Sequence, residues 1–154
     1  MVIECRLLSQ ERLCIFEYKI IFLAMKSLKT YNSEIQLDER GFLRIAFNDT
    51  DDEIEFDEIK QQIDACYIIS EGKPIPVLID VRNGKKNLSP EARNYAGKQN
   101  PHRHLKLAEA LLINSLAQRI MANFFIKFNK HHHPSKVFTR EEAAVKWLLQ
   151  HAKK

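Results

Sequence analysis

Glycine is scarce in this sequence, with only four glycines in 154 residues. A phosphate-binding loop needs several glycines within a few positions, and the sequence contains no such loop. The serine motif of a nucleophile elbow and the HExxH motif of zinc proteases are also missing. The sequence therefore predicts a protein that is not an enzyme and that holds no cofactor.

Cysteine is also rare, and Cys5, Cys14 and Cys66 do not have the spacing of a metal site. Free thiols are typical of proteins from a reducing cytoplasm. The most apolar N-terminal stretch, CIFEYKIIFLAM, contains two charged residues and is too short to cross a bilayer. It also lacks the small-residue cleavage site of a signal peptide. We therefore expect a cytoplasmic protein without a membrane span.

The chain has no long block of one charge sign, although its formal net charge is +4. Lysine and arginine are scattered among aspartate and glutamate, whereas nucleic-acid-binding proteins gather basic residues on one face. Most aromatic residues stand at positions spaced for a core, not for stacking on bases. We therefore expect no nucleic-acid partner.

Hydrophobic periodicity predicts the order of the elements. Two alternating runs on either side of DERG predict a β-hairpin over 35–47, with Gly41 in the turn. Further strands are predicted over 75–81, 104–114 and 136–138, and helices over 56–67, 89–98, 115–130 and 139–154. Helices that alternate with strands act as crossovers between parallel strands. The prediction is an α/β fold with a mostly parallel central sheet, an N-terminal hairpin and about four helices.

The first 24 residues differ from the rest because they show no clear period. The segment that begins at Met25, MKSLKTYNSEIQL, reads like the start of a protein. We expect residues 1–30 to be an N-terminal extension that is poorly ordered or not native, and residues 31–154 to form the domain. The alternative is an additional helix or strand that packs on the domain.

The last two helices carry capping-box patterns, SLAQ from Ser115 to Gln118 and TREE from Thr139 to Glu142. An apolar stripe along the first of these helices predicts that it packs flat on the sheet. This stripe consists of Leu116, Ile120, Met121, Phe124, Phe125 and Phe128. The predicted buried face of the final helix consists of Ala143, Trp147, Leu148 and His151.

Three stretches of the chain, GKPIPVLIDVRNGKKNLSPEARNYA, EALLINSLAQRIMANFFIKFNK and PSKVFTREEAAVKWL, resemble SpoIIAA-like or STAS-like domains, and more narrowly a bacterial subgroup of them. Members of the anti-sigma-factor antagonist type carry a serine at the start of the helix after a central strand, and a partner kinase phosphorylates it. Ser89 stands at about that place here, in NLSPEA where the family has Asp-Ser-Ser-Gly. The resemblance implies a regulatory module that binds a protein partner, such as a kinase or an anti-sigma-like regulator.

Two compatible interpretations of Ser89 follow from the residues around it. The first is a helix cap, because Pro90 and Glu91 are both favoured in a first helical turn. The second is a phospho-acceptor at an exposed helix start. The predicted partner-binding surface consists of Asp80, Arg82, Lys85, Lys86, Ser89 and Arg93.

Asp80 also has two interpretations. It ends the predicted central strand, where open α/β sheets place ligand sites. Its alternative role is to hold the following loop by accepting hydrogen bonds from backbone N–H groups.

The segment NKHHHP, with histidines at 131 to 133, invites a metal interpretation. Adjacent residues of an extended loop point in different directions, so we expect no metal site and solvated histidines. The alternative function is the binding of a small anionic or lipid-like ligand between the sheet and the helix over 116–128. The sequence does not predict the oligomeric state.

Overall fold

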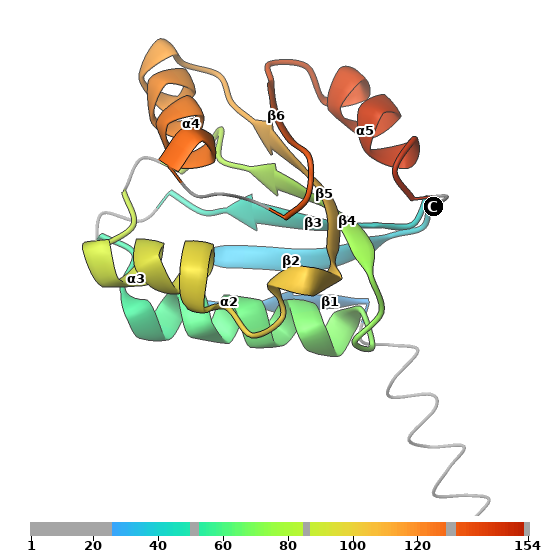
Figure 1. The fold of residues 1–154 in the computed structure, drawn as a ribbon, viewed down its shortest axis with the longest axis horizontal. Coiled ribbons are helices and arrows are strands. Elements are labelled where there is room, and N and C mark those ends of the chain that lie inside the picture. The colour runs from blue at the N-terminus through green and yellow to red at the C-terminus, as the bar shows by residue number, and fades with distance from the viewer. Residues whose placement is uncertain (1–25, 50–52, 85–86, 129–131, 153–154) are drawn as a thin grey trace, which may run out of the picture.

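The structure is a computed structural model that describes residues 26–49, 53–84, 87–128 and 132–152. Its centre is one six-stranded sheet in which the strands follow one another in chain order (Figure 1). The first three strands pair antiparallel, and β3 to β6 pair parallel. The strands are β1 (Ser27–Lys29), β2 (Ser33–Asp38), β3 (Phe42–Phe47), β4 (Ile75–Asp80), β5 (Lys106–Leu112) and β6 (Ser135–Phe138).

The helices connect the parallel strands as predicted. They are α2 (Phe56–Ile69), α3 (Pro90–Asn94), α4 (Leu116–Phe128) and α5 (Glu141–Leu149). A π-helical turn, Tyr95–Gln99, continues α3, and a 3-10 turn, Arg103–Leu105, precedes β5. The predicted fold class, α/β with an N-terminal hairpin and a mostly parallel sheet, is confirmed. No helix in the described ranges combines the length and the apolar character that a membrane crossing requires.

The hairpin of β2 and β3 turns at Gly41, whose φ of 93° lies in the left-handed region that favours glycine. One edge of the domain differs from the prediction, because β1 lies inside the predicted extension and pairs with β2. The ordered sheet therefore begins before residue 31. Residues 1–25 of the predicted extension lie outside the described residues.

Helices cover both faces of the sheet. On one face, Ala144 and Leu148 of α5 pack against Leu78 and Leu112 of the central strands. On the opposite face, α2 packs on the hairpin and β4, whereas Ala122 of α4 packs near Leu111 of β5. In Figure 1, α2 and α3 lie at the bottom of the view, and α4 and α5 lie at the top, where they cover opposite faces of β5 and β6.

The prediction that the apolar stripe of α4 packs flat on the sheet is wrong. Leu116 is 72% exposed and Ile120 is 62% exposed, and Met121 and Phe124 are also exposed. Instead, Ala122 is buried against the sheet, on the side where α4 contacts β6. The helix therefore presents large apolar side chains away from the core.

The predicted start of α5 is also wrong. The helix begins at Glu141 after Arg140, which makes no side-chain cap, and not after Thr139. The side chain of Glu141 is instead bound to arginines of the sheet. The buried face consists of Ala144, Val145 and Leu148, with Trp147 partly buried.

Candidate functional site

A cleft of about 430 Å³ lies on the α2 and α4 side of the sheet. Its floor includes apolar side chains of β3, β4 and β5, such as Ile45, Ile79 and Leu111. Both Ile75 and Val81 line it, so it follows β4 over about 20 Å at the rise of a strand. The cleft is therefore long and mostly apolar.

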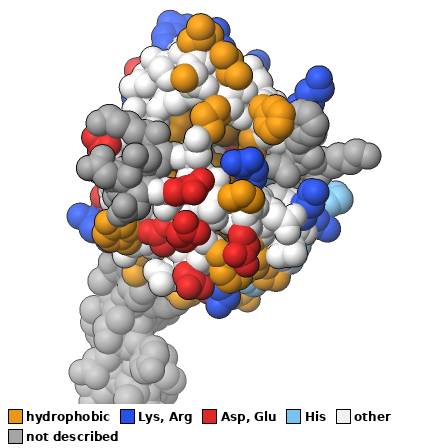
Figure 2. Space-filling view, turned by 90° about the vertical axis from the view of Figure 1, so that its left-hand side faces the viewer, with side chains coloured by type: hydrophobic (Ala, Val, Ile, Leu, Met, Phe, Trp, Pro, Cys, Tyr) orange, Lys and Arg blue, Asp and Glu red, His pale blue; other side chains and the backbone are white. Residues whose placement is uncertain are grey.

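Helix α4 forms one wall of the cleft with its exposed stripe. Ile120, Met121 and Phe124 line the cleft, whereas Leu116 does not. Figure 2 shows hydrophobic side chains gathered at the top of the molecule, where α4 lies. Exposed apolar patches on soluble domains often mark binding sites.

Polar contacts attach the first turn of α4 to the loop after β4. Gln118 donates from Nε2 to the carbonyl oxygens of Val81, at 2.7 Å, and Gly84, at 3.1 Å. Its Oε1 accepts a hydrogen bond from the N–H of Asn114, and its N–H donates to Oγ of Ser115. The predicted cap at Ser115 is thus confirmed in part, since the Gln118 side chain binds one residue earlier than a capping box requires.

A buried ion pair lines the cleft near the start of β5. Nζ of Lys106 lies 2.6 Å from Oε2 of Glu109, whose side chain is 1% exposed. Burial alone would raise the pKa of Glu109, but the Lys106 ammonium and His133 together lower it more, so the pKa lies well below its usual range. Glu109 is therefore ionised and acts only as a hydrogen-bond acceptor.

A β-bulge places this pair on one face. Residues three apart in a regular strand point to opposite faces. Here Ile75 pairs with Lys106 and Val77 with Glu109, so β5 has one more residue than β4 in this interval. The bulge lies opposite Pro76, which has no N–H for the sheet.

The histidine loop contributes His133 to the same region. Its Nε2 lies 3.8 Å from Oε2 of Glu109, and its side chain is 7% exposed. The prediction of solvated histidines is therefore wrong for His133, whereas His132 is exposed and His131 lies outside the described residues. No group of side chains suited to a metal ion occurs in the described part of the chain.

Cys66 of α2 lines the cleft as well. Burial raises the pKa of its thiol to about 11 despite the nearby Lys106. The thiol is therefore protonated at neutral pH, and its environment disfavours a nucleophilic role.

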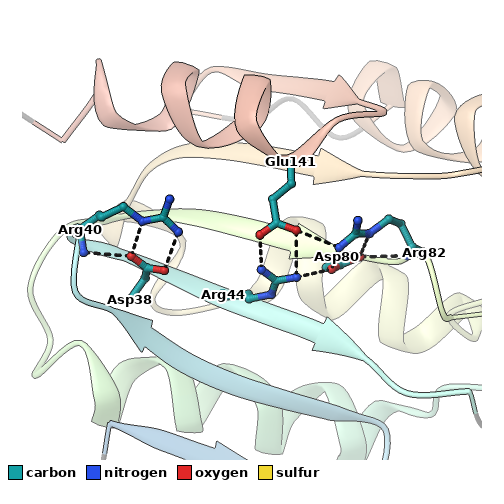
Figure 3. A network of polar contacts seen from close by, with 6 residues as sticks. All are labelled: Asp38, Arg40, Arg44, Asp80, Arg82 and Glu141. Carbon is teal, nitrogen blue, oxygen red and sulfur yellow. Dashed lines mark hydrogen bonds and ion pairs between the residues drawn. The ribbon is translucent and has the colours of Figure 1, made fainter.

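Asp80 belongs to a separate network on the α5 side of the sheet (Figure 3). Its Oδ2 lies 2.7 Å from Nη2 of both Arg44 and Arg82, and these two arginines also bind Glu141 of α5. Oδ1 accepts the backbone N–H of Arg82 at 3.2 Å, so Asp80 holds the loop after β4, which is one of its two predicted roles. Burial raises the pKa of Asp80, but Arg82 and Arg44 together lower it more, so the carboxyl is ionised.

Ser89 is the N-cap of α3, since its Oγ accepts the N–H of Ala92 at 3.2 Å. A cap of this kind stabilises by about 1 kcal/mol. Ser89 is only 6% exposed, and a kinase needs access to the hydroxyl. The cap interpretation is confirmed, and burial counts against the phospho-acceptor interpretation.

The predicted partner-binding surface divides into two parts. On the α5 side, Arg82 donates hydrogen bonds to both Asp80 and Glu141. Ser89 and Arg93 lie in the layer of α2 and α3, where Arg93 donates to the carbonyl of Leu88 and lines the cleft. Lys85 and Lys86 lie outside the described residues.

Comparisons with known proteins agree with this fold. A crystal structure of an uncharacterised protein of the DUF3478 family from Shewanella loihica PV-4, which has a SpoIIAA-like fold, superposes with a TM-score of 0.54. The match covers 79% of this chain and 90% of that chain at 17% sequence identity, so it shows the fold alone. No curated protein is significantly similar to the chain. Residues 35–152 match the family described as Domain of unknown function (DUF7793), and the chain belongs to this family.

Proposed function

We propose that the protein is a binding module that holds an apolar small molecule in the cleft between α2 and α4. The observation that carries this proposal is the cleft itself, with about 430 Å³ of space along β4 and a mostly apolar lining. Small-molecule sites in proteins have volumes of roughly 300–1,000 Å³ and join apolar walls to a few polar groups. Here the polar groups include the ion pair of Lys106 and Glu109, and Arg93 and Arg103 also line the cleft.

The position of α4 supports the same function. The exposed large apolar side chains of this helix face away from the core, and three of them, Ile120, Met121 and Phe124, line the cleft. A ligand in the cleft would remove part of this apolar surface from water, and this burial favours binding. The wall is held in place by Gln118 at its first turn and by Ala122, which is buried against the sheet.

Protein binding switched at Ser89, the function implied by the family resemblance, has less support in the geometry. Ser89 is buried, and the residues predicted for the partner surface lie on two sides of the sheet. We also propose no reaction, because the ionisable groups Lys106 and Glu109 are engaged with each other.

Dye binding to matched α4 variants tests the proposal. Ile120→Gln is expected to weaken binding of N-phenyl-1-naphthylamine, a neutral apolar dye, several-fold, because Ile120 lines the cleft. Leu116→Gln, one turn earlier and also exposed, is the control and is expected to leave the dissociation constant unchanged. Fluorescence titration of the full chain measures both constants, and both variants should keep the stability of the parent protein within about 0.5 kcal/mol.

Two outcomes would contradict the proposal. Equal weakening by both substitutions would mean that the dye binds the outer surface of α4 and not the cleft. Absence of saturable binding to the parent protein would mean that the cleft does not hold apolar molecules.

A further inference from the structure

The cleft contains a buried acceptor with unused capacity. Among the residues that the structure describes, none donates a hydrogen bond to Oε1 of Glu109, because His133 approaches the other oxygen, Oε2, at 3.8 Å. Lys106 binds the other carboxylate oxygen, Oε2. The hydroxyl of Ser135, the register partner of Glu109 on β6, makes no hydrogen bond to it either. A buried acceptor without a donor is costly, and a bound ligand can supply the donor.

We propose that the ligand is an apolar molecule with a neutral hydroxyl group, which donates a hydrogen bond to Oε1 of Glu109. This inference rests on the proposed function, because it assigns the polar end of a molecule whose apolar body occupies the cleft. Glu109 and Lys106 both line the cleft beside apolar residues such as Leu105. A ligand along β4 would therefore meet the ion pair with its polar end.

The charges of the site decide between classes of polar group. Glu109 is ionised and offers only acceptor sites, so an ether oxygen or a carboxylate cannot satisfy Oε1. A carboxylate would also face the negative charge of Glu109. An ammonium could donate, but it would add a second cation to a buried site that already holds Lys106, whose side chain is 26% exposed. A hydroxyl adds no charge, and it can donate to Glu109 while it accepts from the Lys106 ammonium.

Competition for the dye site tests this assignment with three ligands of similar length. 1-Decanol and its isomer 1-methoxynonane differ in that only the alcohol donates a hydrogen bond, and decanoate carries a negative charge. We expect 1-decanol to displace N-phenyl-1-naphthylamine with an inhibition constant at least about tenfold lower than that of either other ligand, as expected for a hydrogen bond to a charged group. In Glu109→Gln, the amide oxygen is expected to accept from Lys106 and the NH2 group to face the ligand, so the preference for the alcohol over the ether should disappear. The preference should persist in Ser135→Ala, with folding checked by near-ultraviolet circular dichroism.

The outcomes separate this inference from the proposed function. Equal displacement by the alcohol and the ether would overturn the hydroxyl assignment and leave the apolar site in place. Tighter binding of decanoate would overturn it in favour of recognition by Lys106. Loss of the preference in Ser135→Ala, but not in Glu109→Gln, would overturn the role of Glu109. Failure of all three ligands to displace a dye that binds would overturn the proposed function as well.

Discussion

Lys106→Met is expected to lower the free energy of unfolding by about 3–5 kcal/mol at pH 7. The substitution removes the ammonium that lies 2.6 Å from Glu109 and leaves the carboxylate buried, with Nε2 of His133 at 3.8 Å. A buried charge that loses its partner is strongly destabilising, whereas the intact pair roughly balances the cost of its own burial. Urea unfolding followed by circular dichroism measures the difference.

The chain offers a matched control for this substitution. Lys73 lies at the same distance, 2.6 Å, from Glu71, but this pair is exposed on the surface. Lys73→Met should change the free energy of unfolding by less than about 1 kcal/mol, because exposed ion pairs contribute little. Equal effects of the two substitutions would mean that the Lys106 pair does not differ from a surface pair.

Protonation of Glu109 should have opposite effects on the stability of the parent protein and of Lys106→Met. In the parent protein, the pKa of Glu109 is below its ordinary value of 4.5, so its contribution to stability is present above roughly pH 5 and is lost as the pH falls. In Lys106→Met, burial raises the pKa of Glu109 above its value in the parent protein, because His133 alone then opposes the effect of burial. Protonation of Glu109 then favours the folded state. The variant should therefore recover part of its lost stability between about pH 7 and pH 5. A variant whose deficit is constant over this range would contradict the account.

Asp80→Asn is expected to lower the free energy of unfolding by about 2 kcal/mol, the second largest effect. The side chain of Asp80 is 9% exposed, and it binds Arg44 and Arg82 at 2.7 Å. Asparagine keeps the oxygen that accepts the N–H of Arg82, but it removes the negative charge of Asp80. Glu141 is then the remaining carboxylate that binds both arginines in this network. The measurement is again urea unfolding at pH 7.

Asp38→Asn is the control for this substitution, because Asp38 also binds an arginine at 2.8 Å. Its partner Arg40 lies at the exposed hairpin, so the cost should stay below about 1 kcal/mol. Neither substitution should change dye binding, since neither residue lines the cleft. Weaker dye binding in Asp80→Asn would show that the network supports the cleft and not only the loop after β4.

The order of the elements could be predicted because each one carries its own periodicity. The apolar run IPVLID forms β4, which is buried between α5 on one face and α2 on the other. The turn residues were equally informative, since Gly41 and Ser89 have the conformations that their types favour. These features are determined by residues that are adjacent in the sequence, so they can be predicted from it.

The environment of α4 could not be predicted in the same way. Periodicity shows that Leu116, Ile120 and Phe124 share one face of a helix, but not what that face contacts. In the structure, the small Ala122 packs on the sheet, and Ile120 and Phe124 line the cleft. The pattern therefore predicted the helix correctly but predicted the wrong face of it to pack on the sheet.

The contact between Lys106 and Glu109 at the polar end of the cleft could not be predicted from their spacing in the sequence. The alternation of a regular strand separates Lys106 from Glu109, and only the bulge opposite Pro76 brings them together. Proline within a central strand was the one available signal of this irregularity. In the other network, Arg44 and Glu141 are 97 residues apart, so their contact follows from the fold alone.

Mapping of 1-decanol by amide chemical shifts tests the central claim most directly. In a titration of the full chain, we expect the largest saturable shifts at residues that line the cleft on three elements, such as Ile79, Leu111 and Met121. Residues of α5, such as Leu148, should not shift. Saturable shifts that centre on α5, or shifts that never saturate, would contradict the assignment of this cleft as a binding site.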